Sequence, residues 1–434
     1  MREDIDSEIL RLAIPNMISN ISIPLLSTVD VMLMGDIDVA NLAAIGIGTV
    51  LFNMIYWNLG FLRMGTTGMV AQAYGANDVK GIAAILGRAI IVAAVFACMI
   101  LLIQSVLFSG GEMFFSLEGE QLLLTKQYFN VRIWAAPATL LIYVLFGWLF
   151  GMQNAWLPLW GTICINVVNM IVSYVLVSEY NMGMRGVALG TVVAQYCGVV
   201  LLSVMIVVKY RKYIGFDWGM IVSDVKAFGL FLSINGDIFV RTVCLTFVFS
   251  FFYAVSVELG TVVLAVNVIL QQFINWMSYA IDGFAYAAES LVGKYRGAQN
   301  GDVLKRMIVR CLGWSAAIAF LFSVAFYCFD TNLVLLFSDD RNAIAASEPL
   351  LAYVCIFPLI AVASYIWDGI FVGLLATKSM RNSMVISLGM FLLTLQVLPQ
   401  YENGEHIWIA LCVFVIARGG IQSLLYYRYG TELK

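Results

Sequence analysis

Long apolar stretches recur from one end of this chain to the other, and they leave little choice of fold outside a membrane. Each is about 20 residues or longer, which is the length a helix needs to cross the hydrocarbon core of a bilayer. Only short polar turns separate them, so the pattern predicts an all-α membrane protein with twelve transmembrane helices. The stretches lie near residues 9–34, 42–74, 81–108, 121–151, 156–178, 184–208, 226–252, 260–293, 304–328, 344–375, 380–398 and 406–428.

Composition agrees with this assignment and excludes several classes of protein. Of the 434 residues, 62% are hydrophobic and 12% are charged, whereas a soluble domain carries about 25% charged residues. The net charge of −3 and the scattered basic residues argue against a nucleic-acid partner. The eight cysteines lie in apolar stretches without a Cys-x-x-Cys pair, so we expect no zinc site and no disulfide frame. Residues 1–8 lack the basic region of a signal peptide, so we expect the first apolar stretch to be retained.

The distribution of Lys and Arg predicts how the chain faces the membrane. If the amino terminus is cytoplasmic, 17 of the 24 basic residues lie on the cytoplasmic side and three, Lys126, Arg185 and Arg341, lie on the other. The remaining four lie within spans or at their ends: Arg63, Arg132, Arg241 and Arg418. Cytoplasmic loops of membrane proteins are enriched in Lys and Arg. We therefore expect both termini to be cytoplasmic, in the inner membrane of a bacterium.

An internal repeat divides the chain into halves. A shift of 222 residues lays Asn53 on Asn275 and Gly75-Ala76 on Gly297-Ala298. Each half contains six spans, and an even number preserves orientation, so the two six-helix lobes should be related by a pseudo-two-fold axis along the membrane normal. The predicted parts are an amino-terminal lobe, an inter-lobe linker and a carboxy-terminal lobe, at residues 1–208, 209–226 and 227–434.

Five acidic residues lie within the predicted spans, where charge is costly and usually serves a function. They are Asp30, Asp237, Asp282, Glu289 and Asp368. A carboxyl group removed from water keeps its proton more readily, so it can bind and release a proton near neutral pH. Such a group, loaded from one side of the membrane and unloaded to the other, is what proton-coupled exchange requires.

Asp30 is the strongest candidate for a proton carrier, because no basic residue lies within one helical turn of it. The alternative is a solvated acid near the outer mouth of the protein. Pro15 and Pro24 precede it in the same span, and proline usually bends a helix. That bend is either static or responsive to the charge of Asp30.

The acids of the second half have basic residues as possible partners. Asp237 and Arg241 are four residues apart, a spacing that suits an ion pair on one helix face, with either a structural or a coupling role. Asp282 and Glu289 are seven apart and share a face. Their possible partners are the arginines of the spans, Arg63, Arg241 and Arg418. Three Gly-x-x-x-Gly motifs predict close helix packing rather than sites, and they begin at Gly147, Gly186 and Gly369.

Enzymatic chemistry finds little support. The single histidine, His406, lies in a predicted outer loop, so no Ser–His or Cys–His pair can form in the membrane. The stretch 373–379 ends in Lys-Ser but lacks the glycine of a phosphate-binding loop. We therefore expect no enzyme, no cofactor and no nucleotide site, and an ion gradient, of H⁺ or Na⁺, as the energy source.

Six segments in order resemble the multidrug and toxic compound extrusion (MATE) family, and specifically its DNA-damage-inducible protein F (DinF) branch. The resemblance runs from about Ile9 to Arg428. The segments are Phe-Leu-Arg-Met-Gly-Thr-Thr-Gly (61–68), Ala-Gln-Ala-Tyr-Gly-Ala (71–76), Gly-Trp-Leu-Phe-Gly-Met-Gln (147–153), Asp-Gly-Phe-Ala-Tyr-Ala-Ala-Glu (282–289), Asp-Gly-Ile-Phe-Val-Gly (368–373) and Met-Arg-Asn-Ser-Met (380–384).

The resemblance implies two six-helix lobes around a central cleft that opens alternately to each side. Its members export organic, often cationic, compounds in exchange for H⁺ or Na⁺. Asp30 matches the coupling acid of this branch, and Asn169 and Thr191 match polar residues of the same cavity. Ser173 stands where the family often has an Asp, which weakens the case for a two-carboxylate Na⁺ site and favours H⁺.

Two further positions take a role from the resemblance. Pro15 matches the proline at which the first helix bends in some related structures. Asp368 aligns with a tenth-helix acid implicated in cation binding in the NorM branch, which implies a second ion site in the carboxy-terminal lobe. Asp237, Arg241, Asp282 and Glu289 would belong to the same charge network.

The sequence thus predicts a monomeric secondary antiporter for small amphipathic or cationic organic substrates, embedded in lipid. One alternative is a flippase for lipids or lipid-linked oligosaccharides, which would share the fold and have an arginine-lined cleft. The other is a membrane enzyme or sensor, which would need a catalytic cluster or an added domain.

Overall fold

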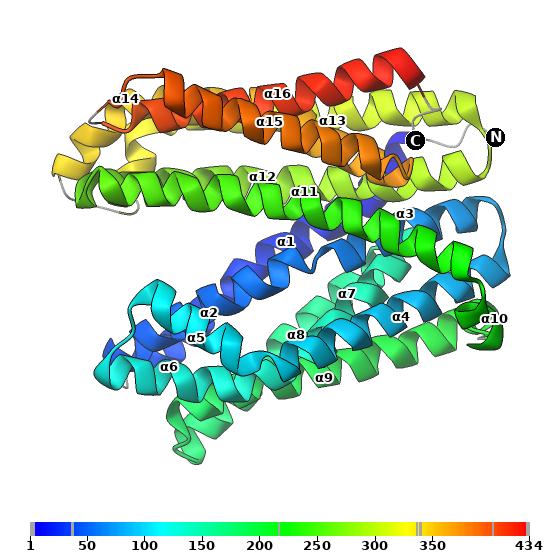
Figure 1. The fold of residues 1–434 in the computed structure, drawn as a ribbon, viewed down its shortest axis with the longest axis horizontal. Coiled ribbons are helices and arrows are strands. Elements are labelled where there is room, and N and C mark those ends of the chain that lie inside the picture. The colour runs from blue at the N-terminus through cyan, green and yellow to red at the C-terminus, as the bar shows by residue number, and fades with distance from the viewer. Residues whose placement is uncertain are drawn as a thin grey trace. The chain divides into compact units, whose positions relative to one another are not determined.

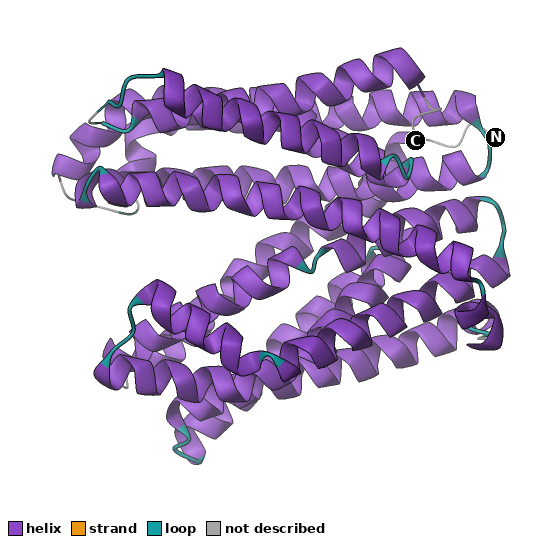
Figure 2. Ribbon diagram, viewed as in Figure 1, coloured by secondary structure: helices purple, strands orange, loops and turns teal. Residues whose placement is uncertain are grey.

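The structure is a computed structural model that describes residues 5–35, 39–215, 218–335, 337, 341–401 and 403–430, with the side chains of 23–35 among those outside the description. The described residues form helices joined by turns, and they contain no strand (Figures 1 and 2). The helices of the first half are α1 (Ile5–Gly35), α2 (Val39–Asn58), α3 (Phe61–Gly75), α4 (Val79–Leu102), α5 (Gln104–Phe115), α6 (Gly119–Arg132), η1 (Ile133–Ala135), α7 (Ala136–Gly151), α8 (Trp156–Tyr174), η2 (Val175–Glu179), α9 (Gly183–Tyr210) and η3 (Arg211–Tyr213). Those that follow are α10 (Trp218–Ser223), α11 (Val225–Glu258), α12 (Thr261–Gly297), α13 (Gly301–Leu335), α14 (Arg341–Gly373), α15 (Thr377–Val397) and α16 (Glu405–Tyr429).

The predicted spans correspond to helices one by one. Within the described residues, 11 helical stretches are long and apolar enough to cross a membrane. The helix α1, with 31 residues, corresponds to the remaining predicted span. Two of the spans are interrupted helices, because α2 continues into α3 and α6 continues through η1 into α7. The all-α, twelve-helix prediction is confirmed, as expected where lipid forces backbone hydrogen bonds to be satisfied within each helix.

The chain forms two compact units. The amino-terminal unit is Ile18–Leu232, and the carboxy-terminal unit combines Met1–Met17 with Ser233–Lys434. The seam near residue 232 lies close to the end of the predicted linker, whereas the first residues of α1 group with the second unit. The lobe boundaries at 208 and 227 stay a prediction.

Small residues set the helix spacing in the amino-terminal unit, where α7 packs against α3 and α4, and α8 packs against α9. A Cβ on Gly147 would lie 2.4 Å from the carbonyl oxygen of Arg63, and one on Gly151 would lie 2.9 Å from that of Thr67. Only glycine allows the backbones of α3 and α7 to approach so closely. The packing role predicted for this Gly-x-x-x-Gly motif is confirmed.

The same device operates in the carboxy-terminal unit, where α12 packs against α13 and α14, and α14 packs against α16. The long helices of this unit run along roughly the same direction (Figure 1). A Cβ on Gly369 would lie 2.2 Å from the carbonyl oxygen of Ala285, and one on Gly373 would lie 2.7 Å from that of Glu289. The predicted close contact is confirmed, and it places the side chain of Asp368 in a tightly packed layer between helices.

Charged contacts hold the beginning of α1 to the carboxy-terminal unit. Glu8 pairs with Lys294 at 3.0 Å and accepts a hydrogen bond from the Tyr295 hydroxyl at 2.8 Å. The indole of Trp314 donates to Asp6 at 3.0 Å. The following part of α1 belongs to the other unit, so this helix connects both.

Candidate functional site

Three of the polar residues predicted for the amino-terminal lobe lie together on α8 and α9. The Nδ2 atom of Asn169 donates to Oγ1 of Thr191 at 3.0 Å, and that hydroxyl donates to the carbonyl oxygen of Val187 at 3.3 Å. Asn169 is only 1% exposed, and Ser173, one turn further along α8, is completely buried. Buried polar side chains are normally hydrogen-bonded, and Ser173 Oγ has no partner among the described residues. The group therefore offers unused hydrogen-bonding capacity inside an apolar unit.

The local sequence explains why these side chains meet. A Cβ on Gly190 would lie 2.1 Å from Ser173 Oγ and 2.9 Å from the Ser173 nitrogen, so glycine is needed for α9 to approach α8 at this level. Gly186 makes a similar approach to Leu176, with a Cβ distance of 3.2 Å to its carbonyl carbon. Directly after α8 the chain forms the π-helical segment η2, and such segments often occur at functional sites. The second Gly-x-x-x-Gly motif therefore positions the polar group.

The first helix borders this region through its second part. Ser19 Oγ donates to Thr162 Oγ1 at 3.2 Å, and Asn166 Nδ2 donates to the carbonyl oxygen of Ser22 at 3.5 Å. Asp30 belongs to α1, but its side chain lies outside the described residues, so its grouping with Asn169 and Thr191 stays a prediction.

Pro15, the predicted bend, is buried within α1. It lies two residues before Met17, where the contacts of the helix change from the carboxy-terminal to the amino-terminal unit. Its role as a bend stays a prediction.

Asp368 of α14 lies at the centre of a charge cluster in the carboxy-terminal unit. Arg241 of α11 forms an ion pair with its Oδ2 atom, and Arg418 of α16 donates to the same oxygen at 2.5 Å. Gln422, one turn after Arg418, donates to Oδ1 at 2.9 Å. We call these four residues the Asp368 cluster. Both carboxylate oxygens accept hydrogen bonds, and two guanidinium groups face one acid.

Asp237 does not form the predicted pair with Arg241. Its Oδ1 atom accepts from Arg381 at 2.6 Å and its Oδ2 atom accepts from the Thr377 hydroxyl at 2.9 Å, both on α15. Arg241 pairs with Asp368 instead. The spacing of four residues allows a pair on one helix face, but in a bundle the partners on neighbouring helices give better geometry and satisfy both oxygens.

Asp282 and Glu289 lie on α12. Glu289 is 1% exposed, whereas Asp282 is half-buried. The charge of Asp282 acts on Tyr279 of the same helix. It also acts on Tyr365 of α14, where the charges of Arg418 and Arg241 act as well. The ion pairs of the Asp368 cluster do not include Asp282, so its place in the predicted charge network stays a prediction.

Three participants in these contacts were not predicted from the sequence as site residues. Thr377 and Arg381 follow a turn near the end of the tenth span, and Arg381 stands in the Met-Arg-Asn-Ser-Met segment (380–384) of the family resemblance. Gln422 lies four residues after Arg418, so the two share a helix face. That spacing of a cation and an amide inside an apolar helix was the available signal.

Comparison with known proteins assigns the family. The sequence model of the MatE family matches residues 15–175 and 238–398. These two matches together cover more than half of the chain. The chain belongs to the MatE family. The two matches begin at residues 15 and 238, within one residue of the shift seen in the internal repeat, so the repeat corresponds to two MatE units in tandem.

Curated relatives extend along nearly the whole chain. DNA damage-inducible protein F of Escherichia coli K12 is 31% identical over 98% of this MatE chain and 92% of its own length. The probable multidrug resistance protein NorM of Rhizobium meliloti is 24% identical over 94% of this chain and 90% of its own. The predicted resemblance to MATE proteins and to the DinF branch is therefore confirmed.

Solved structures agree with the fold. An outward-facing multidrug resistance transporter of the MATE family superimposes with a TM-score of 0.87, covering 100% of this chain and 97% of the other at 17% identity. At that identity the likeness shows the fold alone. This MatE protein is a multi-pass integral membrane protein with the two-lobed architecture of the family.

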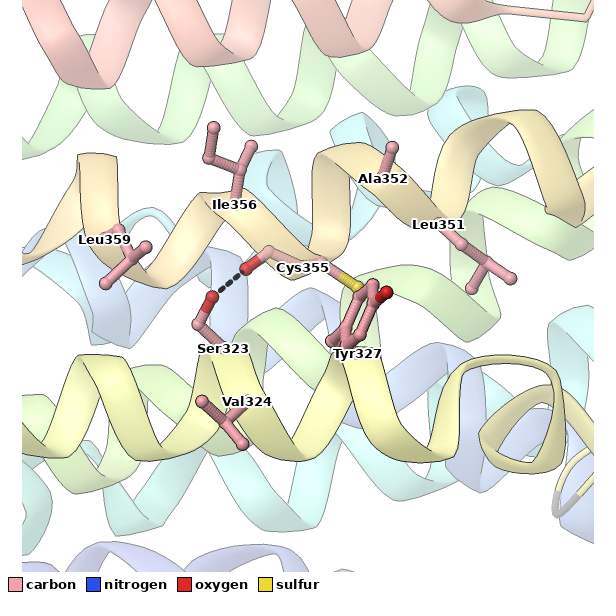
Figure 3. Close-up of a pocket in the computed structure, with 8 residues that line it drawn as sticks. All are labelled: Ser323, Val324, Tyr327, Leu351, Ala352, Cys355, Ile356 and Leu359. Carbon is pink, nitrogen blue, oxygen red and sulfur yellow. Dashed lines mark hydrogen bonds between the residues drawn. The ribbon is translucent and has the colours of Figure 1, made fainter.

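An apolar groove lies on the carboxy-terminal unit between α13 and α14, and none of the predicted site residues is among the residues that line it (Figure 3). Two of the residues that line it are joined by a hydrogen bond, in which the Ser323 hydroxyl donates to the carbonyl oxygen of Cys355 at 2.5 Å. Tyr327 beside it is 76% exposed. This lining suits contact with lipid chains on a membrane-spanning surface.

The described part of the chain contains no group of three or more His, Cys, Asp or Glu side chains that could hold a metal ion.

Proposed function

We propose that this MatE protein is a secondary antiporter that exports amphipathic, often cationic, organic compounds in exchange for H⁺ by alternating access. The named relatives are a DNA damage-inducible protein and a probable multidrug resistance protein. No cofactor takes part in this proposal, because the coupling ion supplies the energy.

The observation that carries the proposal is the buried polar group of Asn169, Ser173 and Thr191 beside α1. Ser19 contacts Thr162 and Ser22 contacts residue 166, so the residue numbers increase together along the two helices. The helices α1 and α8 therefore run in the same direction. If that register continues at 1.5 Å per residue, position 30 of α1 reaches the level of Ser173. That position would then be level with the unused hydrogen-bonding capacity of Ser173, and in this proposal proton and substrate exclude each other there.

The coupling ion in this proposal is H⁺ rather than Na⁺. In the carboxy-terminal unit, Asp368 accepts hydrogen bonds at both oxygens and lies against two guanidinium groups, which repel a cation. In the amino-terminal unit, Ser173 supplies a hydroxyl where a second carboxylate would favour a metal cation. Both observations favour a site that titrates a single acid.

The transport cycle in this proposal uses α1 as the connection between the units. Its start is held to the carboxy-terminal unit by Asp6 and Glu8, and its continuation belongs to the amino-terminal unit. A bend near Pro15 would let the two units move while both contacts persist. We place both termini in the cytoplasm, the protein in the bacterial inner membrane, and the working unit as a monomer.

The experiment is dye efflux from proteoliposomes with a pH gradient and a Na⁺ gradient imposed separately. We expect the pH gradient alone to drive efflux and Asp30→Asn to abolish it, because an amide cannot carry a proton. Asp302→Asn, which removes an exposed carboxyl group at the start of α13, is the matched control and should transport like the parent protein.

Full efflux in Asp30→Asn would refute the role of Asp30. Efflux driven by Na⁺ and indifferent to pH would refute proton coupling and leave the transporter assignment in place.

A further inference from the structure

The Asp368 cluster contains more positive than negative charge. Arg241 and Arg418 both bind Oδ2 of Asp368, while the neutral Gln422 occupies Oδ1. The side chain of Arg418 is 3% exposed and that of Asp368 is 5% exposed. Charge inside a membrane protein is normally balanced by a partner of opposite sign. Here one carboxylate serves two guanidinium groups.

The cluster also contains more hydrogen-bond donors than acceptors. A guanidinium group carries five N–H donors. Arg418 uses its Nη2 atom for Asp368 and for the carbonyl oxygen of Ser364 at 3.2 Å, and Arg241 uses its Nη2 atom for Asp368. The Nε atoms of both arginines are buried and have no hydrogen-bond partner among the described residues. Unused guanidinium donors on two neighbouring groups suit an anion with several acceptor oxygens.

The exposed side of the Asp368 cluster indicates where such an anion would enter. Arg241 reaches the surface, with 11% of its side chain exposed. Tyr365 lies against Arg418, with the ring centroid 5.8 Å from the guanidinium carbon, and its hydroxyl is hydrogen-bonded to Ser278 at 2.7 Å. Ser278, Tyr365 and Asp282 are half-buried, so this side of the cluster is accessible. Asp282 is the acid whose charge opposes an incoming anion there.

Asp237, one turn before Arg241 on α11, does not neutralise the Asp368 cluster. Asp237 binds Arg381 and Thr377 of α15. Its charge is therefore balanced locally, by an arginine outside the cluster.

We infer that Arg241 and Arg418 form a binding subsite for the anionic group, a carboxylate or a phosphate, of an amphiphilic substrate. The inference rests on the proposed export of amphipathic compounds and adds to it a substrate class, amphiphiles that carry a negative group. Arg241, the more exposed arginine, would bind the incoming anion first, and the buried Arg418 would hold it further inside. Asp368 would compete with the anion for both guanidinium groups.

The test is equilibrium binding of two dyes to the purified full-length protein in detergent, measured by fluorescence anisotropy. One dye is a xanthene with an esterified benzoate, and the other is the same dye as the free acid. We expect Arg241→Gln to weaken binding of the free acid about tenfold, the loss of one charge-assisted contact, and to leave the ester unchanged. Arg310→Gln is the matched control, because it breaks the Arg310–Asp6 pair of the same unit, 3.5 Å long, without changing the charge of the cluster or the partner of Asp237, and it should bind both dyes like the parent protein.

Two further variants distinguish an anion-binding subsite from the alternative, in which Arg241, Asp368 and Arg418 only hold the helices together. Asp368→Asn and Asp282→Asn each remove a competing negative charge, so we expect both to bind the free acid more tightly than the parent protein. If Arg241, Asp368 and Arg418 only hold helices together, Asp368→Asn should have the opposite effect, because both arginines would lose the carboxylate that they bind. Thermal melting of each variant shows whether it is folded. If Asp368→Asn does not fold, binding by Arg241→Gln and Asp282→Asn carries the test.

Equal binding of acid and ester by the parent protein, or equal weakening of both dyes in Arg241→Gln, would overturn the inference. Repeating the titration in nanodiscs of neutral and of anionic lipid identifies the source of the anion, since competition by anionic lipid assigns the subsite to a headgroup. Binding is measured without any gradient. Failure of efflux with intact free-acid binding would therefore count against the proposed function alone.

Discussion

Replacing Gly190 by alanine separates α8 from α9 at the polar group of the amino-terminal unit. The new Cβ would lie 2.1 Å from Ser173 Oγ, 2.9 Å from its nitrogen and 3.0 Å from its Cα. The hydroxyl can rotate away but the backbone atoms cannot, so α9 must shift. Overpacking of this kind costs about 1–3 kcal/mol. Loss of the hydrogen bond from Asn169 to Thr191 adds about 1 kcal/mol, and the better helix propensity of alanine returns about 1 kcal/mol.

We therefore expect Gly190→Ala to lower the free energy of unfolding by about 1–3 kcal/mol and to slow dye efflux. The free energy is measured by denaturant titration of the purified protein, and efflux in proteoliposomes. Gly46→Ala is the matched control, because a Cβ on Gly46 of α2 meets nothing within 4 Å. That change should stabilise the protein by roughly 0.5–1 kcal/mol. Equal stability of the two variants, or efflux of Gly190→Ala at the parent rate, would refute the close-packing argument.

Three other changes have expected results in the same unfolding assay. Asp237→Asn should lower the free energy of unfolding by about 1–3 kcal/mol, less than the 3–5 kcal/mol typical of a fully buried pair, because the Arg381 side chain is 36% exposed; an unchanged free energy would show that the pair is not formed. Gly369→Ala should cost about 1–3 kcal/mol, since its Cβ would lie 2.2 Å from the carbonyl oxygen of Ala285; a stability gain would contradict the packing of α12 on α14. Glu8→Gln removes the charge that ties α1 to α12 and should cost about 1 kcal/mol at low salt and less at high salt; a cost independent of salt would exclude an ionic tie.

The predictions that succeeded from the sequence depended on local patterns. A membrane span needs only length and apolar composition, because each helix satisfies its own backbone hydrogen bonds. The three Gly-x-x-x-Gly motifs, beginning at Gly147, Gly186 and Gly369, were read correctly as close contacts for a similar reason. Glycine on one face of a helix permits approach whichever helix lies opposite.

Pairing of the charges could not be predicted in the same way. The spacing of Asp237 and Arg241 suggested one ion pair on α11, and the structure has two pairs that join α11 to α15 and to α14. Arg381 is 144 residues from Asp237 in the chain, and no local pattern relates them. A pair on one helix competes with partners on its neighbours, and the packing of the bundle decides which geometry satisfies more donors and acceptors.

The sequence by itself therefore determined the spans, their duplication and the membrane class, because hydrophobic length and internal repetition are properties of the chain alone. It also named Asn169, Ser173 and Thr191 as candidates through the family resemblance, and their role in transport stays a prediction. Only the tertiary structure decided that two arginines face Asp368 and that α1 is shared between the compact units. Both depend on which helices lie side by side, and the energy of a buried charge is set by its neighbours in space.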